Sequence, residues 1–262
     1  MKKMSNSLKR WQASRNAELG SPTSWLGLIG LFWLAPGLNS VGNAAGATVV
    51  LGKGPALLGN LLWEEGRILW QPAAGPELVL ETDLHGAPTI VDFENLSFFV
   101  VDREGQLAVR IRDRDWAATT TFGGLEYFPH DPAWRIEAEW QSIDPPLQME
   151  VPNVSGDLKA VEVSRCAVFA VGGQAVTLLP MAVGPDEAFF VFRDRTSGKE
   201  TYGAGRFLKV PLHGDERITL DFNFAYNPPC AFTPFATCPL PPPENWLPFA
   251  VPVGEKKWVK PD

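Results

Sequence analysis

The chain has 262 residues, a formal net charge of −7 and a pI of about 5.1. This acidic balance lacks the basic surface that binding to a nucleic-acid backbone usually needs, so nucleic acid is not an expected partner. Hydrophobic residues make up 45% of the chain, but the longest apolar run, residues 25–35, is too short to cross a bilayer. We therefore expect a globular protein with no membrane span.

The cysteine content indicates a reducing compartment. Three cysteines are too few for a disulfide scaffold and odd in number, so we expect a cytoplasmic location. The basic residues ahead of the apolar run resemble a signal peptide, but that charged region is too long and contains Glu18. We therefore do not expect secretion.

The first twenty residues predict an amphipathic helix. Apolar or long side chains recur there every three or four residues, at Met4, Leu8, Trp11, Arg15 and Leu19. Gly20 and Pro22 are typical of a helix end. The apolar stripe needs a partner surface, which is either one end of a sheet core, another protein chain or a membrane surface.

The rest of the chain predicts a mainly β fold. The whole sequence has 24 Gly and 24 Pro, and these turn residues separate short apolar runs. Such a pattern favours many strands and few long helices. Strands are expected at 47–51, 67–70, 78–81, 96–101, 107–111, 134–140, 158–163, 166–171, 175–179, 188–192, 205–210 and 217–222. We predict an antiparallel barrel or sandwich, with residues 1–36 as a helix and apolar packing segment and residues 37–262 as one continuous β assembly.

Residues 37–42, G-L-N-S-V-G, open this β region in a recognisable order. Together with the strand patterns at 48–51 and 66–70, they resemble the opening of forkhead-associated sandwiches. The resemblance implies a sandwich subdomain of that kind near the N-terminus. No Arg follows Gly42, so the phosphopeptide-reading role of that family does not carry over.

Residues 192–245 hold the densest set of chemically functional side chains. Strand alternation places Asp221 and Asn223 on one face, and the Tyr226-Asn227-Pro-Pro segment then leaves the ladder as a rigid loop. We predict that this loop lies across a pocket that binds a small molecule or an anion. The candidate ligand-binding residues are Arg112, Arg135, Tyr202, Arg206, Asp221, Asn223, Tyr226, Asn227, Cys230 and Cys238.

Other interpretations of the same residues stay open. The spacing of Cys230 and Cys238 matches neither a Cys-x-x-Cys pair nor a zinc knuckle, so they are packing thiols, a redox pair or metal ligands. We expect no metal and no other cofactor. An enzyme would be a cofactor-free hydrolase or lyase using Asp221 or Tyr226, with Cys230 as a further candidate. A third alternative is a structural or partner-binding protein that uses the N-terminal helix.

Six motifs resemble a bacterial family known only as domain of unknown function 1684. They are W-L-G-L-I-G-L-F-W-L at 25–34, R-I-R-D at 110–113, F-G-G-L-E-Y-F-P at 122–129, T-S-G-K-E-T-Y-G-A-G-R-F-L at 196–208, D-F-N-F-A-Y-N-P-P-C-A-F-T at 221–233 and A-T-C-P-L-P-P-P-E-N at 236–245. The resemblance implies that the apolar run near residue 25 belongs to the folded protein. It implies no activity, because the family has none assigned.

Overall fold

The chain folds into two compact units. The computed structural model describes residues 5–120, 122–154, 156, 158–214 and 216–260. One unit combines residues 1–19 with residues 122–262, and the other contains residues 20–121. Contacts thus divide the chain after residues 19 and 121 and not at residue 36, and the expected helix belongs to the unit that contains the C-terminus.

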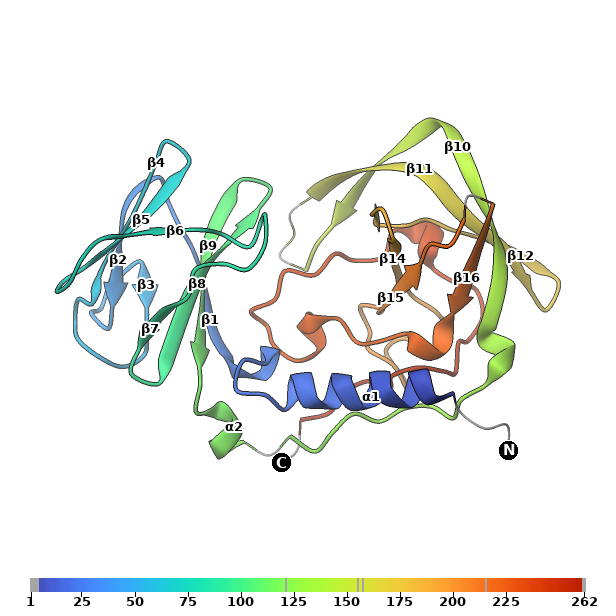
Figure 1. Ribbon diagram of the computed structural model, residues 1–262, viewed down its shortest axis with the longest axis horizontal. Coiled ribbons are helices and arrows are strands. Elements are labelled where there is room, and N and C mark those ends of the chain that lie inside the picture. The colour runs from blue at the N-terminus through green and yellow to red at the C-terminus, as the bar shows by residue number, and fades with distance from the viewer. Residues whose placement is uncertain (1–4, 121, 155, 157, 215, 261–262) are drawn as a thin grey trace. The chain divides into compact units, whose positions relative to one another are not determined.

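Two sheets make up the unit of residues 20–121 (Figure 1). Their strand orders are β1-β9-β8-β7 and β3-β2-β4-β5-β6, and all neighbours are antiparallel except β2 and β3. The strands are β1 (Leu28–Trp33), β2 (Gly37–Gly42), β3 (Val49–Val50), β4 (Gly59–Glu64), β5 (Arg67–Pro72), β6 (Leu78–Leu80), β7 (Val91–Phe93), β8 (Leu96–Arg103) and β9 (Gln106–Asp113). Short helices η1 (Trp25–Gly27) and α2 (Trp116–Thr119) flank them in the sequence.

The core of this unit lies between its two sheets. Every second residue of β8, at Leu96, Phe98 and Val100, points into one hydrophobic cluster that also holds Leu61 and Trp70 of the other sheet. The rings of Trp70 and Phe98 meet edge to face with centroids 5.1 Å apart. This arrangement of two sheets around a shared apolar layer is a sandwich.

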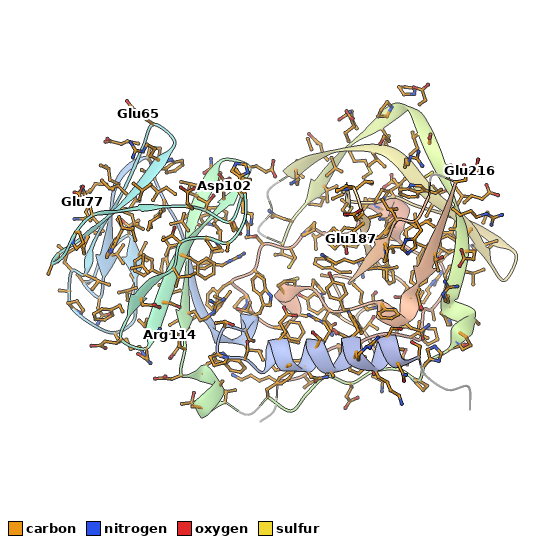
Figure 2. The ribbon with its side chains drawn as sticks, viewed as in Figure 1. Glu65, Glu77, Asp102, Arg114, Glu187 and Glu216 are labelled. Carbon is orange, nitrogen blue, oxygen red and sulfur yellow. The ribbon has the colours of Figure 1, made fainter. Side chains whose placement is uncertain are left out.

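Tight turns connect the hairpins of this unit. Glu65 and Gly66 join β4 to β5 with φ angles of 50° and 73°, and Glu104 and Gly105 join β8 to β9 with φ angles of 53° and 80°. Two consecutive positive φ values are typical of the type I′ turn, whose twist matches that of the flanking strands. Glu65 lies at the tip of the β4–β5 hairpin (Figure 2).

The second unit also contains two sheets. Their orders are β12-β11-β10-β16 and β13-β14-β15, with all neighbours antiparallel. The strands are β10 (Arg135–Pro152), β11 (Leu158–Val171), β12 (Gln174–Leu178), β13 (Ala182–Val183), β14 (Glu187–Phe192), β15 (Arg206–Pro211) and β16 (Arg217–Asp221). Its loops contain the single-turn helices η2 (Pro132–Trp134), η3 (Phe222–Phe224), η4 (Pro229–Ala231) and η5 (Pro243–Asn245).

One hydrophobic cluster joins the two sheets of this second unit. It contains Trp140 on β10, Phe190 and Phe192 on β14, and Leu220 on β16. Among the described strands, none of the four sheets in the chain closes on itself. The mainly β prediction is therefore confirmed, and of its two forms the sandwich describes the sheets while the closed barrel does not.

The long hairpin β10–β11 differs from its expected form. Residues 158–163 and 166–171, expected as two strands, form the single strand β11. Strand β10 runs through Pro145 and Pro146, and its pairing with β11 shifts register between Ser142 and Leu147. Proline has no N–H to donate to the ladder, so the pairing resumes only beyond the two prolines.

The expected N-terminal helix is confirmed as α1 (Asn6–Leu19), although Met4 lies outside the described residues. Leu8 and Leu19 are fully buried, and Trp11 meets the ring of Phe224 edge to face at 5.3 Å. Helix α1 therefore packs on the C-terminal part of its own unit (Figure 1). Within the described residues, no helix has both the length and the apolar character of a membrane span.

Candidate functional site

A pocket of about 560 Å³ brings together residues of the last three sequence motifs, at 196–208, 221–233 and 236–245. Tyr202 comes from the turn before β15, and Cys230 comes from η4. The pocket is lined by Val154, Tyr202, Cys230, Ala231, Phe232, Thr233, Pro234 and Ala236. Its volume lies in the usual range for small-molecule sites. Tyr202 and Cys230 are thus two predicted site residues that share one cavity.

The Pro-Pro-Cys sequence explains how Cys230 is presented. Pro228 and Pro229 begin the single turn η4, in which the fixed φ of proline is pre-set for the first helical positions. The turn closes when the amides of Ala231 and Phe232 donate to the carbonyls of Pro228 and Pro229 at 2.9 and 3.0 Å. Cys230 therefore stands on a rigid turn and is half-buried at the pocket wall.

Cys238 is held by the end of β10. The amide of Val154 donates to the Cys238 carbonyl at 3.0 Å, and the amide of Leu240 donates to the Pro152 carbonyl at 2.8 Å. These bonds extend the β10 edge with the segment around Pro239. The Cys238 side chain is 4% exposed, and its Sγ accepts the Cys230 amide at 3.2 Å.

Tyr202 is positioned by a buried polar turn. The Thr196 and Thr201 hydroxyls lie 2.8 Å apart, and the Gly205 amide donates to the Tyr202 carbonyl at 3.1 Å. From this turn the Tyr202 hydroxyl reaches the Cys230 carbonyl and donates to it at 3.0 Å. Burial raises the pKa of Tyr202 above its ordinary value of 10.0, so the phenol stays protonated and can keep donating at neutral pH.

The Cys238 side chain affects the ionisation of the pocket thiol Cys230. A hydrogen bond with the Cys238 side chain lowers the pKa of the Cys230 thiol below its ordinary value, although burial acts in the opposite direction. Burial raises the pKa of the third cysteine, Cys166, which is buried on β11. All three cysteines are thiols. Among them, Cys230 combines a lowered pKa with access to a pocket.

Arg206 is a clamp within the protein and does not face this pocket. Its fully buried guanidinium donates to Asp194 Oδ2 at 2.9 Å and to the Val251 carbonyl at 2.8 Å, and it also contacts the carbonyl of Val253. Burial lowers the pKa of Arg206, while the Asp194 carboxylate opposes that shift. These bonds tie the start of β15 to the C-terminal segment and occupy both terminal nitrogens of the guanidinium, while its Nε has no hydrogen-bond partner among the described residues.

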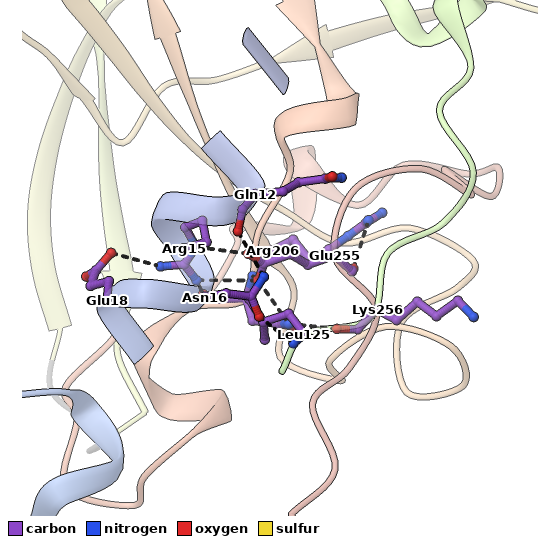
Figure 3. Close-up of polar contacts among 9 residues, drawn as sticks. Gln12, Arg15, Asn16, Glu18, Leu125, Arg206, Glu255 and Lys256 are labelled. Atoms are coloured by element: carbon purple, nitrogen blue, oxygen red, sulfur yellow. Dashed lines mark hydrogen bonds and ion pairs between the residues drawn. The ribbon is translucent and has the colours of Figure 1, made fainter. Parts of the chain in front are cut away.

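A second buried network surrounds Glu255 (Figure 3). Asn227 belongs to this network. The fully buried Glu255 carboxylate accepts Arg15 Nε of α1 at 2.9 Å and the Asn227 amide at 2.8 Å. Asn227 Nδ2 also donates to the Lys256 carbonyl at 2.7 Å. Arg15 pairs in addition with Glu18 at 3.5 Å. This network fastens α1, the Asn-Pro-Pro loop and the C-terminal segment to one another.

Asp221, Asn223 and Tyr226 also make contacts within the protein. Asp221 Oδ1 accepts the amide and Nδ2 of Asn223 at 3.1 and 2.8 Å, so it caps η3. Asn223 has left strand β16 and donates instead to the Asp131 carbonyl at 2.9 Å. Tyr226 pairs its backbone with Phe207, and the Arg15 guanidinium lies 4.9 Å over its ring. Burial raises the pKa of Tyr226 above its ordinary value.

The two remaining predicted residues lie elsewhere. Arg135 is exposed at the start of β10, where it pairs with Glu137 at 2.9 Å. Arg112 is on β9 in the unit of residues 20–121, with its guanidinium 5.2 Å from the ring centre of Phe99. Burial lowers the pKa of Arg112. Neither residue lines the pocket around Cys230, and a role for them in ligand binding stays a prediction.

Several residues that organise this region had no distinctive sequence signal. Asp194 and Glu255 are single acidic residues without a periodic pattern, yet both are buried acceptors. Asn245 is fully buried and bonds the amide and carbonyl of Leu179 and the carbonyl of Val191, all at 2.8 Å. Asn245 is the last residue of the motif A-T-C-P-L-P-P-P-E-N, so this motif is the sequence signal that could have identified it.

Comparison with known proteins supports the expected family. The family model described as a protein of unknown function (DUF1684) matches residues 120–256, which is more than half of the chain. The chain belongs to this family. The match covers the pocket residues and the contacts of Arg206, but not Arg15 and Glu18 of the Glu255 network, and the expected family membership is confirmed.

Solved structures add one relative of unknown function. The chain is 35% identical to an uncharacterized protein of Haloarcula marismortui whose solution NMR structure is known. The similarity covers 52% of this chain and 77% of that protein, with a TM-score of 0.43. No curated protein matches the chain.

Proposed function

We propose that this DUF1684 protein binds a small, largely uncharged molecule in the pocket around Tyr202 and Cys230. The observation that supports the proposal is the convergence of two long motifs, at 196–208 and 221–233, on one cavity of about 560 Å³. The cavity combines apolar side chains, such as Phe232 and Ala236, with a hydroxyl and a thiol. Apolar walls with a few placed polar groups are typical of small-molecule sites.

The lining residues favour an uncharged ligand over an anion. Among the described residues, the eight side chains that line this pocket include no Lys, Arg, His, Asp or Glu. A buried anion without a paired cation is costly, and the guanidinium of Arg206 is already occupied by Asp194 and backbone carbonyls. Of the two ligand classes predicted from the sequence, an anion therefore has less support than an uncharged small molecule.

A ligand screen with a matched pair of variants tests the proposal. Ala231→Phe adds a ring at the pocket wall, whereas Ala182→Phe adds the same ring on the exposed strand β13. The probes are a set of uncharged amides, lactones and sugars and a second set of carboxylates and phosphates. We expect uncharged compounds to raise the melting temperature of the wild type and of Ala182→Phe but not that of Ala231→Phe.

Two outcomes would contradict this proposal. In the first, every compound that stabilises the wild type also stabilises Ala231→Phe, so binding occurs elsewhere. In the second, only carboxylates and phosphates bind, which an uncharged pocket does not explain.

A thiol-dependent enzyme is the second candidate function, favoured by the lowered pKa of Cys230. The hydrolase or lyase alternative with Asp221 and Tyr226 has less support, since Asp221 caps η3 and the Tyr226 ring lies under Arg15. Incubation of the protein with each pocket ligand, followed by intact mass measurement, tests for a covalent adduct at Cys230. Turnover of a ligand that survives Cys230→Ser would contradict a thiol mechanism.

A further inference from the structure

Cys230 and Cys238 form a pair that the binding proposal does not use. The loop of residues 231–237 brings the two cysteines back together, so that Cys238 Sγ accepts the Cys230 amide at 3.2 Å. Both backbones are fixed, Cys230 by η4 and Cys238 by its bonds along the end of β10. The hydrogen bond between the two side chains brings the thiols into contact, so rotation about each Cα–Cβ bond can bring the sulfurs together, provided that the backbones hold the Cβ atoms about 3.8 Å apart.

The two thiols differ in their access to solvent. Cys230 is half-buried and lines the pocket, whereas Cys238 is 4% exposed and is absent from the pocket lining. A small disulfide entering the pocket therefore meets Cys230 first. Cys238 lies behind it, in position to attack a sulfur bound to Cys230. One accessible thiol backed by one buried thiol is the arrangement that dithiol exchange requires.

We infer that Cys230 and Cys238 are a redox-active dithiol that reduces small-molecule disulfides, with Cys230 as the attacking thiol and Cys238 as the resolving thiol. The inference goes beyond the proposed ligand binding and does not depend on it. The lowered pKa of Cys230 supports the assigned order, because the thiolate is the attacking species.

The exchange balances in two steps. The Cys230 thiolate attacks one sulfur of R–S–S–R and forms a Cys230–S–S–R mixed disulfide, while the S–S bond of the small disulfide breaks and one R–S⁻ leaves and takes a proton from water. The Cys238 thiol then loses its proton to water and attacks Cys230 Sγ, which releases the second R–S⁻. The protein loses two electrons and two protons to form the Cys230–Cys238 disulfide, and the small disulfide becomes two thiols.

Tyr202 fits this scheme as a positioning residue. Its hydroxyl donates to the Cys230 carbonyl at 3.0 Å, and its raised pKa keeps it protonated at neutral pH. The phenol therefore holds η4 in place beside the pocket without itself titrating. Tyr202→Phe is expected to slow the first exchange step while leaving the second step intact.

The test uses the reduced protein and bis(2-hydroxyethyl) disulfide, a small uncharged disulfide, as the probe. After incubation at neutral pH, remaining thiols are trapped with an alkylating reagent in denaturant, and intact mass and peptide mapping locate the modifications. We expect the wild type to carry a Cys230–Cys238 disulfide and one alkyl group, on Cys166. Cys238→Ser is expected to stop at a stable mixed disulfide between Cys230 and the probe, and Cys166→Ser is expected to behave as the wild type.

Three results would overturn the inference. These are complete alkylation of all three thiols in the wild type, a disulfide that involves Cys166, and a persistent mixed disulfide with the probe in the wild type without closure by Cys238. Because the decisive measurement is made on the wild type, it stands even if a serine variant does not fold. Ligand binding in the screen with Ala231→Phe is measured separately, so failure of one proposal is distinguishable from failure of the other.

Discussion

At the scale of single residues, two ion pairs in one unit have the same N–O distance but differ in burial, and therefore in their expected contribution to stability. Arg206 and Asp194 lie 2.9 Å apart with side-chain exposures of 0% and 1%. Lys209 and Glu187 also lie 2.9 Å apart, but with exposures of 56% and 45%. Glu187 is on β14, in the same unit as Asp194 (Figure 2). Water solvates the exposed pair, whereas the buried charges depend on each other.

Asp194→Ala is therefore expected to destabilise the protein by about 3–5 kcal/mol, because it leaves the buried Arg206 unpaired. The matched change Glu187→Ala is expected to cost less than about 1 kcal/mol. Chemical denaturation followed by tryptophan fluorescence measures both. Equal losses for the two variants would show that the Arg206 clamp is not held by its charge partner.

Thiol reactivity should separate the cysteines by their surroundings. Hydrogen bonding with Cys238 lowers the pKa of Cys230, so more Cys230 is thiolate at neutral pH, whereas burial raises the pKa of Cys166. Iodoacetamide is therefore expected to modify Cys230 on the order of tenfold faster than Cys166 at pH 7. The Cys230 rate should level off at a lower pH than that of an ordinary thiol. Peptide mass spectrometry over time gives both rates, and faster labelling of Cys166 would refute the assignment.

At the scale of elements, helix α1 is part of the fold that carries the pocket. Leu8 and Leu19 are buried, and Arg15 reaches the buried Glu255. Most of the stability of a short helix comes from packing of its apolar face. Three partner surfaces were considered for the apolar stripe of α1. The contacts described for its side chains are with the C-terminal segment of the same unit.

Leu8→Ala on α1 is expected to lower the free energy of unfolding by about 2–5 kcal/mol, since it removes a fully buried side chain. Lys9→Ala, next along the helix and exposed, is expected to change it by less than about 0.5 kcal/mol. Urea denaturation at several protein concentrations measures both effects. If Leu8→Ala changed the oligomeric state without loss of stability, the interpretation of α1 as a partner-binding helix would be favoured.

At the scale of the whole molecule, each unit has its own hydrophobic core. The cluster of the 20–121 unit draws only on residues between Leu34 and Ile111, and the cluster of the other unit begins at Ala138. The second unit is discontinuous, yet its two pieces meet directly, because the Leu125 amide donates to Asn16 Oδ1 at 2.9 Å. A short connection is therefore able to replace residues 20–121.

We expect residues 20–121 expressed alone to unfold cooperatively, and we expect the same of a chain in which a short Gly-Ser linker joins residue 19 to residue 122. The linked chain should also retain the faster alkylation of Cys230 relative to Cys166. Near-UV circular dichroism with thermal unfolding tests both shortened chains. A non-cooperative transition in either one would show that its core depends on the other unit.

Local patterns explain how much of this architecture was predictable. A short apolar run bounded by turn residues predicts β8, alternation of apolar residues predicts β9, and the helical spacing that includes Leu8 and Leu19 predicts α1. Strand β2 was missed as a separate strand, since its G-L-N-S-V-G sequence is rich in turn residues, and the continuity of β10 was missed because Pro145 and Pro146 are typical of a break. In both places tertiary pairing prevailed over local preference.

The amino-acid sequence by itself determined the β character, the N-terminal helix and the family, because periodicity and motifs are properties of neighbouring residues. Only the tertiary structure decided that Arg206 faces Asp194, that Arg15 meets Glu255 across 240 positions, and that Cys230 lies beside Cys238. Contacts between distant positions leave no periodic trace in one sequence. Whether a polar side chain binds a ligand or a neighbour depends on which distant groups the fold has already placed within hydrogen-bonding reach.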